Sequence, residues 1–484
     1  MSSRFTAVPL GSGESFILET DVEGRRKVVL VDGGQSKRDD PAKNELLLAI
    51  ERHCPGIGER IDIAICTHRD HDHAGGFPAF VKAWLSRGNE IGEFWLPGAW
   101  SGAVQHVLLD PDRIISLLTE GAAEAAAMSR KAERRPTGDA RFTLTLPSTS
   151  RSIDAQVSEM RTSRRSDSRR GDDAQTFASV QHSVHDATPE VDQHPEQRAA
   201  RAAASWGFSP EDWRVIAGNL DSSSLHVAPL SERFSLQNAF WWLSSKLGAD
   251  PLARTLAANA IDTAEAIRAI ATAAVSFDIP VRWFDFELFE DGRPPAGGRP
   301  GFLIPLNAVE VAAAPRQDEA LVLFLKLTLT EQNVASLVFQ RVETDEEPGV
   351  IFVADSRLAF GIDRPERPFE KHTSPISRPI IYTAAHHGSR NNDHAYEMLA
   401  AWLGGVYPSS IAVRNGGVWN QSLEGYLGVE LRRCAQCYQC HGGAWSQLVQ
   451  ITSGSGRWIW PSEQGRACGT PRAKVRLDRA LAPS

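Results

Sequence analysis

A stretch of six residues, 68–73, constrains this chain more than any other, because five of the six can bind a metal ion. It reads His-Arg-Asp-His-Asp-His, follows the apolar segment Ile63–Cys66 and precedes the pair Gly75-Gly76. A buried strand, a polar loop and a glycine turn into a helix-like segment are predicted in that order. A plain polar surface loop is disfavoured, since chance rarely places such a cluster between a buried strand and two glycines.

Alternate side chains of an extended loop point to the same side. We therefore expect His68, Asp70 and Asp72 to project together, with His73 joining them where the chain turns. His71 has the opposite parity and is expected to face away. Imidazole and carboxylate ligands suit Zn²⁺, Mn²⁺ or Fe²⁺ better than Ca²⁺.

Two motifs in the second half of the chain carry further candidate ligands. The apolar segment 350–354 is expected to be a strand that ends at Asp355, and segment 380–385 leads into His386-His387-Gly388-Ser389. Taken alone, an aspartate after a strand is ordinary turn chemistry, and two histidines can be structural. Their combination with the 68–73 loop favours a shared metal site.

The 67–76 segment resembles the signature of metallo-β-lactamase-fold hydrolases, Thr-His-x-His-x-Asp-His-x-Gly-Gly, with Asp70 in place of the usual second His. This variant resembles the metallo-hydrolase domain of the ComEC-type DNA-uptake (competence) family. Segments 10–15, 31–34 and 333–338 also resemble that family, the first two as its opening hairpin and the third as its Asn-x-x-Ser-Leu-Val motif.

The resemblance implies an α/β fold, the αββα sandwich of the metallo-β-lactamase type. The expected halves are 1–100 and 276–460. Residues 101–275 would form a helical insertion with a disordered part at 148–204, where bulky apolar residues are sparse. Residues 461–484 would be a tail.

The resemblance also implies the roles of the site residues. His68 and Asp70 would hold one metal ion, a second would be held by Asp72, His73 and His386, and Asp355 would bridge the two. Asp72 would also orient the nucleophile. His387 would contact substrate or protonate a leaving group.

Three points about this site stay open in the sequence. Either His386 or His387 can be the ligand, and we favour His386. The family's middle histidine ligand has no clear equivalent, with His106 and His226 as candidates. Asp32 is expected to be structural, with an outer role near the metals as the alternative. The side chains expected to bind substrate are Ser389, Asn391 and Asn392.

The function implied is that of a dinuclear metal-dependent hydrolase with Zn or Mn, a phosphodiesterase or nuclease that acts on DNA through a hydroxide held between the metals. One alternative is hydrolysis of a small ester, lactone or nucleotide. Another is a metal-binding interaction module without turnover. A partner protein would dock on residues 101–275.

Composition limits these possibilities. The net charge of -8 and the pI of about 6.0 provide no global positive field for nucleic acid, so a polyanion would be bound by local basic groups and metals. The sequence shows neither an apolar run long enough to span a membrane nor a signal peptide. Six cysteines in a chain of this length suggest a reducing cytoplasm.

A cysteine cluster lies near the end of the chain and permits two interpretations. A structural Zn²⁺ site is one, and reduced thiols are the other. Its members are Cys434, Cys437, Cys440 and His441.

Local patterns predict the remaining elements. A hairpin is expected over 8–34 and a helix over 42–53, and strands are expected at 279–284, 321–329, 335–342, 350–354 and 379–384.

Overall fold

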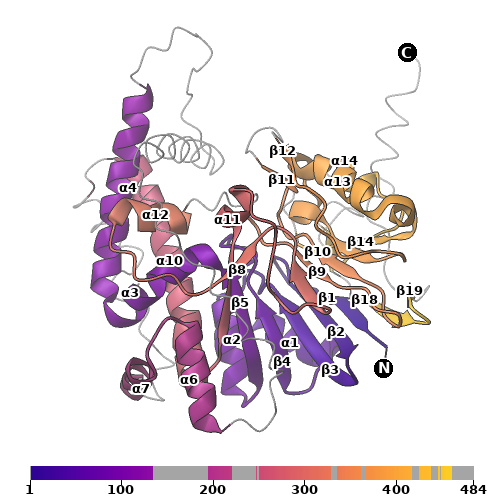
Figure 1. Ribbon diagram of the computed structural model, residues 1–484, viewed down its shortest axis with the longest axis horizontal. Helices are drawn as coiled ribbons and strands as arrows, with labels where there is room; N and C mark the ends of the chain where they lie inside the picture. Colours follow the sequence, from indigo (N-terminus) through magenta and orange to yellow (C-terminus); the bar gives the residue numbers. More distant parts are fainter. Residues whose placement is uncertain are drawn as a thin grey trace. The chain divides into compact units, whose positions relative to one another are not determined.

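The computed structural model describes residues 2–133, 194–220, 247, 250–328, 335–360, 367–416, 424–437, 445–446 and 448–459. The chain is an α/β protein that divides into two compact units, which are considered separately (Figure 1). The first comprises residues 1–99, 279–313 and 332–484, and the second comprises 100–278 and 314–331.

The first unit contains a mixed sheet whose strands run in the order β19-β18-β1-β2-β3-β4-β5-β6-β8. Neighbouring strands from β3 to β6 are parallel, and the other pairs are antiparallel. The bounds are β1 Arg4–Ala7, β2 Phe16–Val22, β3 Arg25–Val31, β4 Arg60–Ile65, β5 Glu90–Pro97, β6 Val281–Asp285, β8 Val309–Val311, β18 Val449–Gly454 and β19 Arg457–Ile459.

The hairpin predicted over 8–34 is β2–β3, and its turn is tighter than expected. Glu23 and Gly24 are the only residues between the strands, and both have positive φ, 54° and 76°. Positive φ at both central residues is the two-residue turn that matches the twist of the flanking strands. The strands therefore extend through the polar segment that the sequence assigned to a loop.

A second sheet in the same unit has the order β15-β14-β13-β10-β9-β7. Its strands from β10 to β15 pair in parallel, whereas β9 pairs antiparallel with β10 and β7. The bounds are β7 Leu303–Pro305, β9 Phe339–Arg341, β10 Val350–Phe352, β13 Ile381–Thr383, β14 Ile411–Arg414 and β15 Arg432–Cys434. The strands predicted at 335–342, 350–354 and 379–384 each contain one of these elements. Two short ribbons complete the strands: β11 Ala359–Phe360 with β12 Arg367–Pro368, and β16 Gln436–Cys437 with β17 Trp445–Ser446.

The two sheets share one hydrophobic core, to which each contributes alternate side chains. Trp95 and Phe284 of the first sheet and Phe339 of the second have ring centroids 4.9 to 5.3 Å apart. Such rings bury large apolar areas and attract one another in tilted and edge-on pairs. The sheets therefore pack face to face.

Helices cover the outer faces of this unit. The bounds are α1 Glu45–His53, α2 Phe77–Ser86, α11 Phe286–Glu290, α13 Asp393–Leu403 and α14 Glu424–Leu427, with 3₁₀ turns η3 Ala385–Gly388, η4 Arg390–Asn392 and η5 Gly404–Ser409. Helix α1 confirms the helix predicted over 42–53, and the Asn44 side chain caps it by accepting from the Leu47 amide. Leu399 and Trp402 of α13 pack in a second core with Tyr382 and Ala412 of the second sheet.

The second unit is helical in its described residues. Its helices are α3 Val104–Leu109, α4 Pro111–Glu133, α6 Pro195–Ser205, α7 Pro210–Asn219, α10 Pro251–Phe277 and α12 Ala320–Thr328, and the turn η1 Gly98–Ala103 leads into it. Asp250 caps α10 through its side chain and Pro251 occupies the first turn, both typical of a helix start. Helix α10 ends at Asp278, which adopts φ 52°.

Two predictions about this unit need correction. The strand expected at 321–329 is helix α12, because a short continuous apolar run has no periodicity that separates a buried helix from a strand. The disordered segment expected over 148–204 is helical from Pro195, where alanines favour a helix. Residues 148–193 of that segment and the 461–484 tail lie outside the described residues.

A search of the described part of the chain for helices long and apolar enough to cross a membrane found none.

Candidate metal centre

The candidate ligands lie in loops at the carboxyl ends of parallel strands. The loop 66–76 follows β4, Asp355 follows β10 by three residues, and the His386-His387 pair follows β13. Asp32 follows β3 and Asn415 follows β14 in the same way. Parallel neighbours direct such loops to one edge of a sheet, which is where α/β folds build their sites.

The 66–76 loop closes into a turn that requires its glycines. The amides of His73 and Ala74 donate to the Asp70 carbonyl at 2.9 and 2.8 Å, and the Gly75 amide donates to His71 at 3.0 Å. A Cβ on Gly75 would lie 2.2 Å from the His71 carbonyl oxygen. His71 itself is exposed, as its parity predicts.

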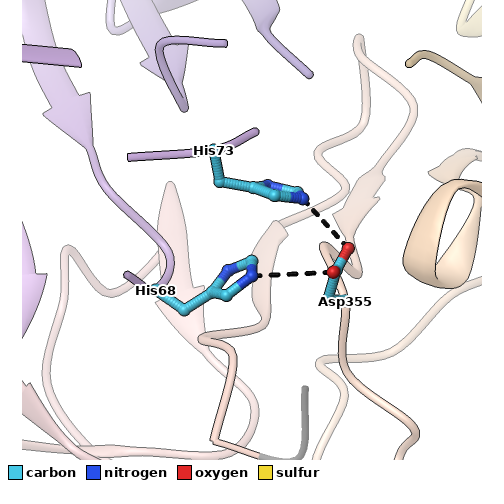
Figure 2. A group of neighbouring side chains, drawn as sticks. All are labelled: His68, His73 and Asp355. Atoms are coloured by element: carbon cyan, nitrogen blue, oxygen red, sulfur yellow. Dashed lines mark ion pairs between the residues drawn. The ribbon is translucent and has the colours of Figure 1, made fainter. Parts of the chain in front are cut away.

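The Asp355 carboxylate lies at the centre of the site and divides four histidines into two pairs. Its Oδ1 is 3.0 Å from Nε2 of His73 and 3.9 Å from Nε2 of His387. Its Oδ2 is 3.6 Å from Nε2 of His68 and 3.5 Å from Nε2 of His386. Figure 2 shows His68 and His73 directed at the two oxygens of Asp355. Imidazoles therefore surround both oxygens of this buried carboxylate, and groups of this kind could hold a metal ion.

Two further aspartates join these pairs, one on each side. Asp70 Oδ2 lies 3.8 Å from His68 Nε2, and Asp72 Oδ2 lies 2.9 Å from His387 Nε2. Asp72, Asp70 and His386 keep 38%, 21% and 14% of their side-chain surface exposed, whereas Asp355, His68 and His73 keep at most 2%. The open rim of the site is therefore formed by these three more exposed side chains.

His387 occupies the place that the sequence favoured for His386. One compact group of potential ligand atoms comprises Asp72, His73 and His387, and a second comprises His68, His73 and Asp355. His386 and His387 both adopt positive φ, 45° and 50°. This backbone, which non-glycine residues seldom adopt, turns two consecutive imidazoles toward opposite oxygens of Asp355, an outcome that strand parity does not predict.

In His73, His387 and His68, the ring nitrogen remote from Asp355 lies against a polar group of the protein. His73 Nδ1 donates to Asp32 at 2.8 Å, and His387 Nδ1 donates to the Asn415 carbonyl at 2.9 Å. His68 Nδ1 lies 2.9 Å from the Thr67 hydroxyl and 3.2 Å from the Ser336 hydroxyl. In neutral imidazoles these bonds leave Nε2 unprotonated and directed into the cluster, as a metal ligand requires.

The charges in the cluster are strongly coupled. Burial alone would lower the pKa of His68, but the Asp355 and Asp70 carboxylates outweigh it and raise that pKa to about 9. Burial would also lower the pKa values of His73 and His387, but nearby carboxylates raise both well above the usual range. Burial also opposes ionisation of Asp355, yet the surrounding imidazoles hold its pKa well below the ordinary value. The carboxylates therefore attract positive charge, which protons or metal ions can provide.

Glu14 is a member of the site that the sequence missed. Its buried Oε2 lies 3.1 Å from His387 Nδ1. Burial raises its pKa, and the neighbouring His387 opposes that rise. The only sequence signal was its position in the Gly-Ser-Gly-Glu-Ser segment at 11–15, which was assigned to a hairpin opening.

Asp32 and Ser336 support the ligands from behind. Asp32 is fully buried and accepts from the Thr67 amide at 2.8 Å as well as from His73, so it holds both residues in place. The Ser336 hydroxyl accepts from the Asp355 amide at 3.2 Å and contacts His68.

The residues expected to bind substrate have other positions. Asn392 is buried, and its Nδ2 donates to the backbone carbonyls of Asp355 and Ser356 at 2.8 and 3.2 Å, so it supports the Asp355 loop. Ser389 is also buried. The Asn391 side chain lies outside the described part of the structure.

Other candidates from the sequence have different contacts or lie outside the described residues. His106 belongs to the second unit, where its Nε2 bonds to the Gln317 carbonyl at 2.8 Å, and His226 lies outside the described residues. Cys434 is buried, and its Sγ accepts from Arg414 at 3.3 Å. The Cys437 side chain, Cys440 and His441 lie outside the described residues, so the zinc prediction for that cluster stays a prediction.

The chemistry of the cluster fits divalent metal ions. His68 Nε2 and Asp355 Oδ1 are buried and have no hydrogen-bond partner among the described residues. Unsatisfied buried ligand atoms cost free energy unless a further group pairs with them. Comparison with protein-family models and with curated protein sequences gave no match to this chain.

Proposed function

We propose that this protein is a dinuclear metal-dependent hydrolase that cleaves phosphodiester bonds, with DNA as the expected substrate. The observation that carries the proposal is the position of Asp355 between two sets of potential ligands. A site without turnover has no physical need for so many convergent ligands.

The two proposed ligand sets have the same composition. His68, Asp70 and His386 form one, and Asp72, His73 and His387 form the other. Asp355 is shared by both. This assignment makes His386 the ligand that replaces the family's middle histidine, and it makes both members of the His386-His387 pair ligands.

Each set combines two imidazoles with carboxylate oxygens, which suits Mn²⁺ or Zn²⁺. When bound to these residues, two divalent ions would supply an activated water near neutral pH and would neutralise the oxygens of an in-line displacement.

Charge favours an anionic substrate. The three aspartates that would ligate the ions, Asp70, Asp72 and Asp355, carry fewer charges than the four of two divalent ions. Asp32 and Glu14 are buried behind the histidines, away from the rim. A local positive charge attracts a phosphodiester even though the whole chain carries -8. The exposed rim of Asp70, Asp72 and His386 is where substrate reaches the centre. Asp72 orients the attacking water there, while the buried members hold the arrangement.

The fold supports the same proposal. Two sheets that share a core and carry helices on their outer faces are the layers of an αββα sandwich. We therefore propose the metallo-β-lactamase type of fold for the first unit.

The test is hydrolysis of bis(p-nitrophenyl) phosphate, single-stranded DNA and double-stranded DNA by purified protein with Mn²⁺ or Zn²⁺. Wild-type protein is expected to turn over phosphodiesters, and Asp72→Ala protein to lose that activity. Turnover that survives in Asp72→Ala would refute the mechanism. Turnover of carboxylic esters without phosphodiesters would refute the proposed substrate class.

A further inference from the structure

We propose that Glu14 is a positioning residue for His387 and that it makes the Asp72 side of the centre the tighter of two unequal metal sites. This inference rests on the proposed dinuclear function.

The ligand sets themselves provide no reason for unequal affinity. Each has two histidines, one aspartate of its own and a share of Asp355. Any difference must therefore arise from the groups behind the ligands.

Those groups differ in charge between the two sides. On the Asp72 side, carboxylates face both histidines, Asp32 at 2.8 Å from His73 Nδ1 and Glu14 at 3.1 Å from His387 Nδ1. On the other side, His68 Nδ1 faces the neutral hydroxyls of Thr67 and Ser336. A carboxylate behind an imidazole makes it a more basic ligand and fixes its orientation.

Backbone contacts place Glu14 firmly against the Asp72 side. The Glu14 amide donates to the Asp72 carbonyl at 2.8 Å, and the Glu14 carbonyl accepts from the Gly34 amide at 3.0 Å. Gly13 permits this approach, since a Cβ there would lie 2.4 Å from the Asp72 carbonyl oxygen. The same short segment therefore fixes the Asp72 loop through its backbone and brings the Glu14 carboxylate to 3.1 Å from His387 Nδ1.

The two consecutive histidines also differ in burial. His386 keeps 14% of its side-chain surface exposed, whereas His387 keeps 1% and lies between Glu14, Asn415 and Asp72. A ligand whose orientation is fixed before the ion arrives loses less conformational freedom on binding.

Calorimetric titration of metal-depleted protein with Co²⁺ tests this inference, with the d–d absorption of bound Co²⁺ as a second readout. Wild-type protein is expected to bind two ions in two resolved steps. Glu14→Gln preserves side-chain size and removes the charge, and is expected to weaken the tighter step by about 10- to 100-fold with the weaker step unchanged. The absorption spectrum of the Glu14→Gln protein should differ from that of wild type only during the tighter binding step.

Ser336→Ala is the matched control, since Ser336 lies behind His68 and the shared Asp355, and it should not weaken the tighter step alone. Should Glu14→Gln fail to fold, Asp32→Asn must weaken the tighter step, and an unchanged tighter step would overturn the inference. Two sites of equal affinity in wild-type protein would overturn the inference without refuting the proposed function. The same holds if both metal-binding constants are unchanged in Glu14→Gln protein. A wild-type protein that binds no metal would overturn both.

Discussion

At the scale of single residues, the His386-His387 pair shows how backbone conformation decides chemistry. Sequence reasoning assigned one ligand and one catalytic group to the pair. Two consecutive positive φ values instead direct the rings to opposite oxygens of Asp355. No pattern of residue types predicts that pairing, because it depends on φ values that L-residues seldom adopt.

The two histidines provide matched variants. His387→Ala and His386→Ala should each lower the metal content from two ions to one, because each removes a ligand from a different set. Phosphodiester turnover should fall by more than about 100-fold in both variants. This loss exceeds the one typical when a residue that hydrogen-bonds to a metal ligand is replaced. Elemental analysis of purified proteins measures the ions. Loss of both ions in one variant and none in the other would contradict the assignment.

Ala354 is a second case of backbone strain at the site. It precedes Asp355 with φ 47°, and the left-handed conformation costs an L-residue about 1 kcal/mol. Glycine does not incur that cost. We expect Ala354→Gly to raise the free energy of unfolding by about 1 kcal/mol in urea titrations. A variant less stable than wild type would show that Ala354 is not strained.

At the scale of elements, the metal loop depends on the glycines that close it. Gly75→Ala should destabilise the protein by about 2 kcal/mol or more and reduce metal content, since its Cβ would collide with the His71 carbonyl. Gly218→Ala in α7 is the control. Nothing lies within 4 Å of a Cβ there, so a slight gain in helix stability is expected. Equal effects of the two substitutions on unfolding would contradict this role of Gly75.

A buried ion pair between β5 and its neighbours predicts a pH dependence. Burial opposes ionisation of Glu93, but Arg299 at 3.1 Å and Arg282 at 3.5 Å lower its pKa below 4.5. Its stabilisation is therefore complete above about pH 4.5 and is lost as the pH falls through the lowered pKa.

Glu93→Gln should lower the free energy of unfolding by about 3 kcal/mol at pH 7. The difference from wild type should shrink in acid, as measured by urea denaturation between pH 7 and 3. A difference that stays constant across this range would refute the assignment.

At the scale of the whole molecule, the sequence indicated which motifs lie at the site better than it indicated which of their residues contact one another. The three ligand motifs follow strands β4, β10 and β13 as expected, because apolar runs and glycines are local signals. Glu14 was missed, since its contact with His387 spans more than 370 positions. Helix α12 was read as a strand because a uniform apolar run has no periodicity. The chain divides into two units near residues 99 and 279, and 314–331 joins the helical unit.

The central claim is that Asp355 joins two metal sites into one centre. Elemental analysis of wild-type and Asp355→Ala protein, each equilibrated with Mn²⁺ or Zn²⁺ and freed of excess metal, tests it most directly. We predict two ions per chain in wild type, and less than one ion with no phosphodiester turnover in Asp355→Ala, because both sets lose their shared ligand. Two retained ions in the folded variant, or a wild type that binds none, would contradict the account.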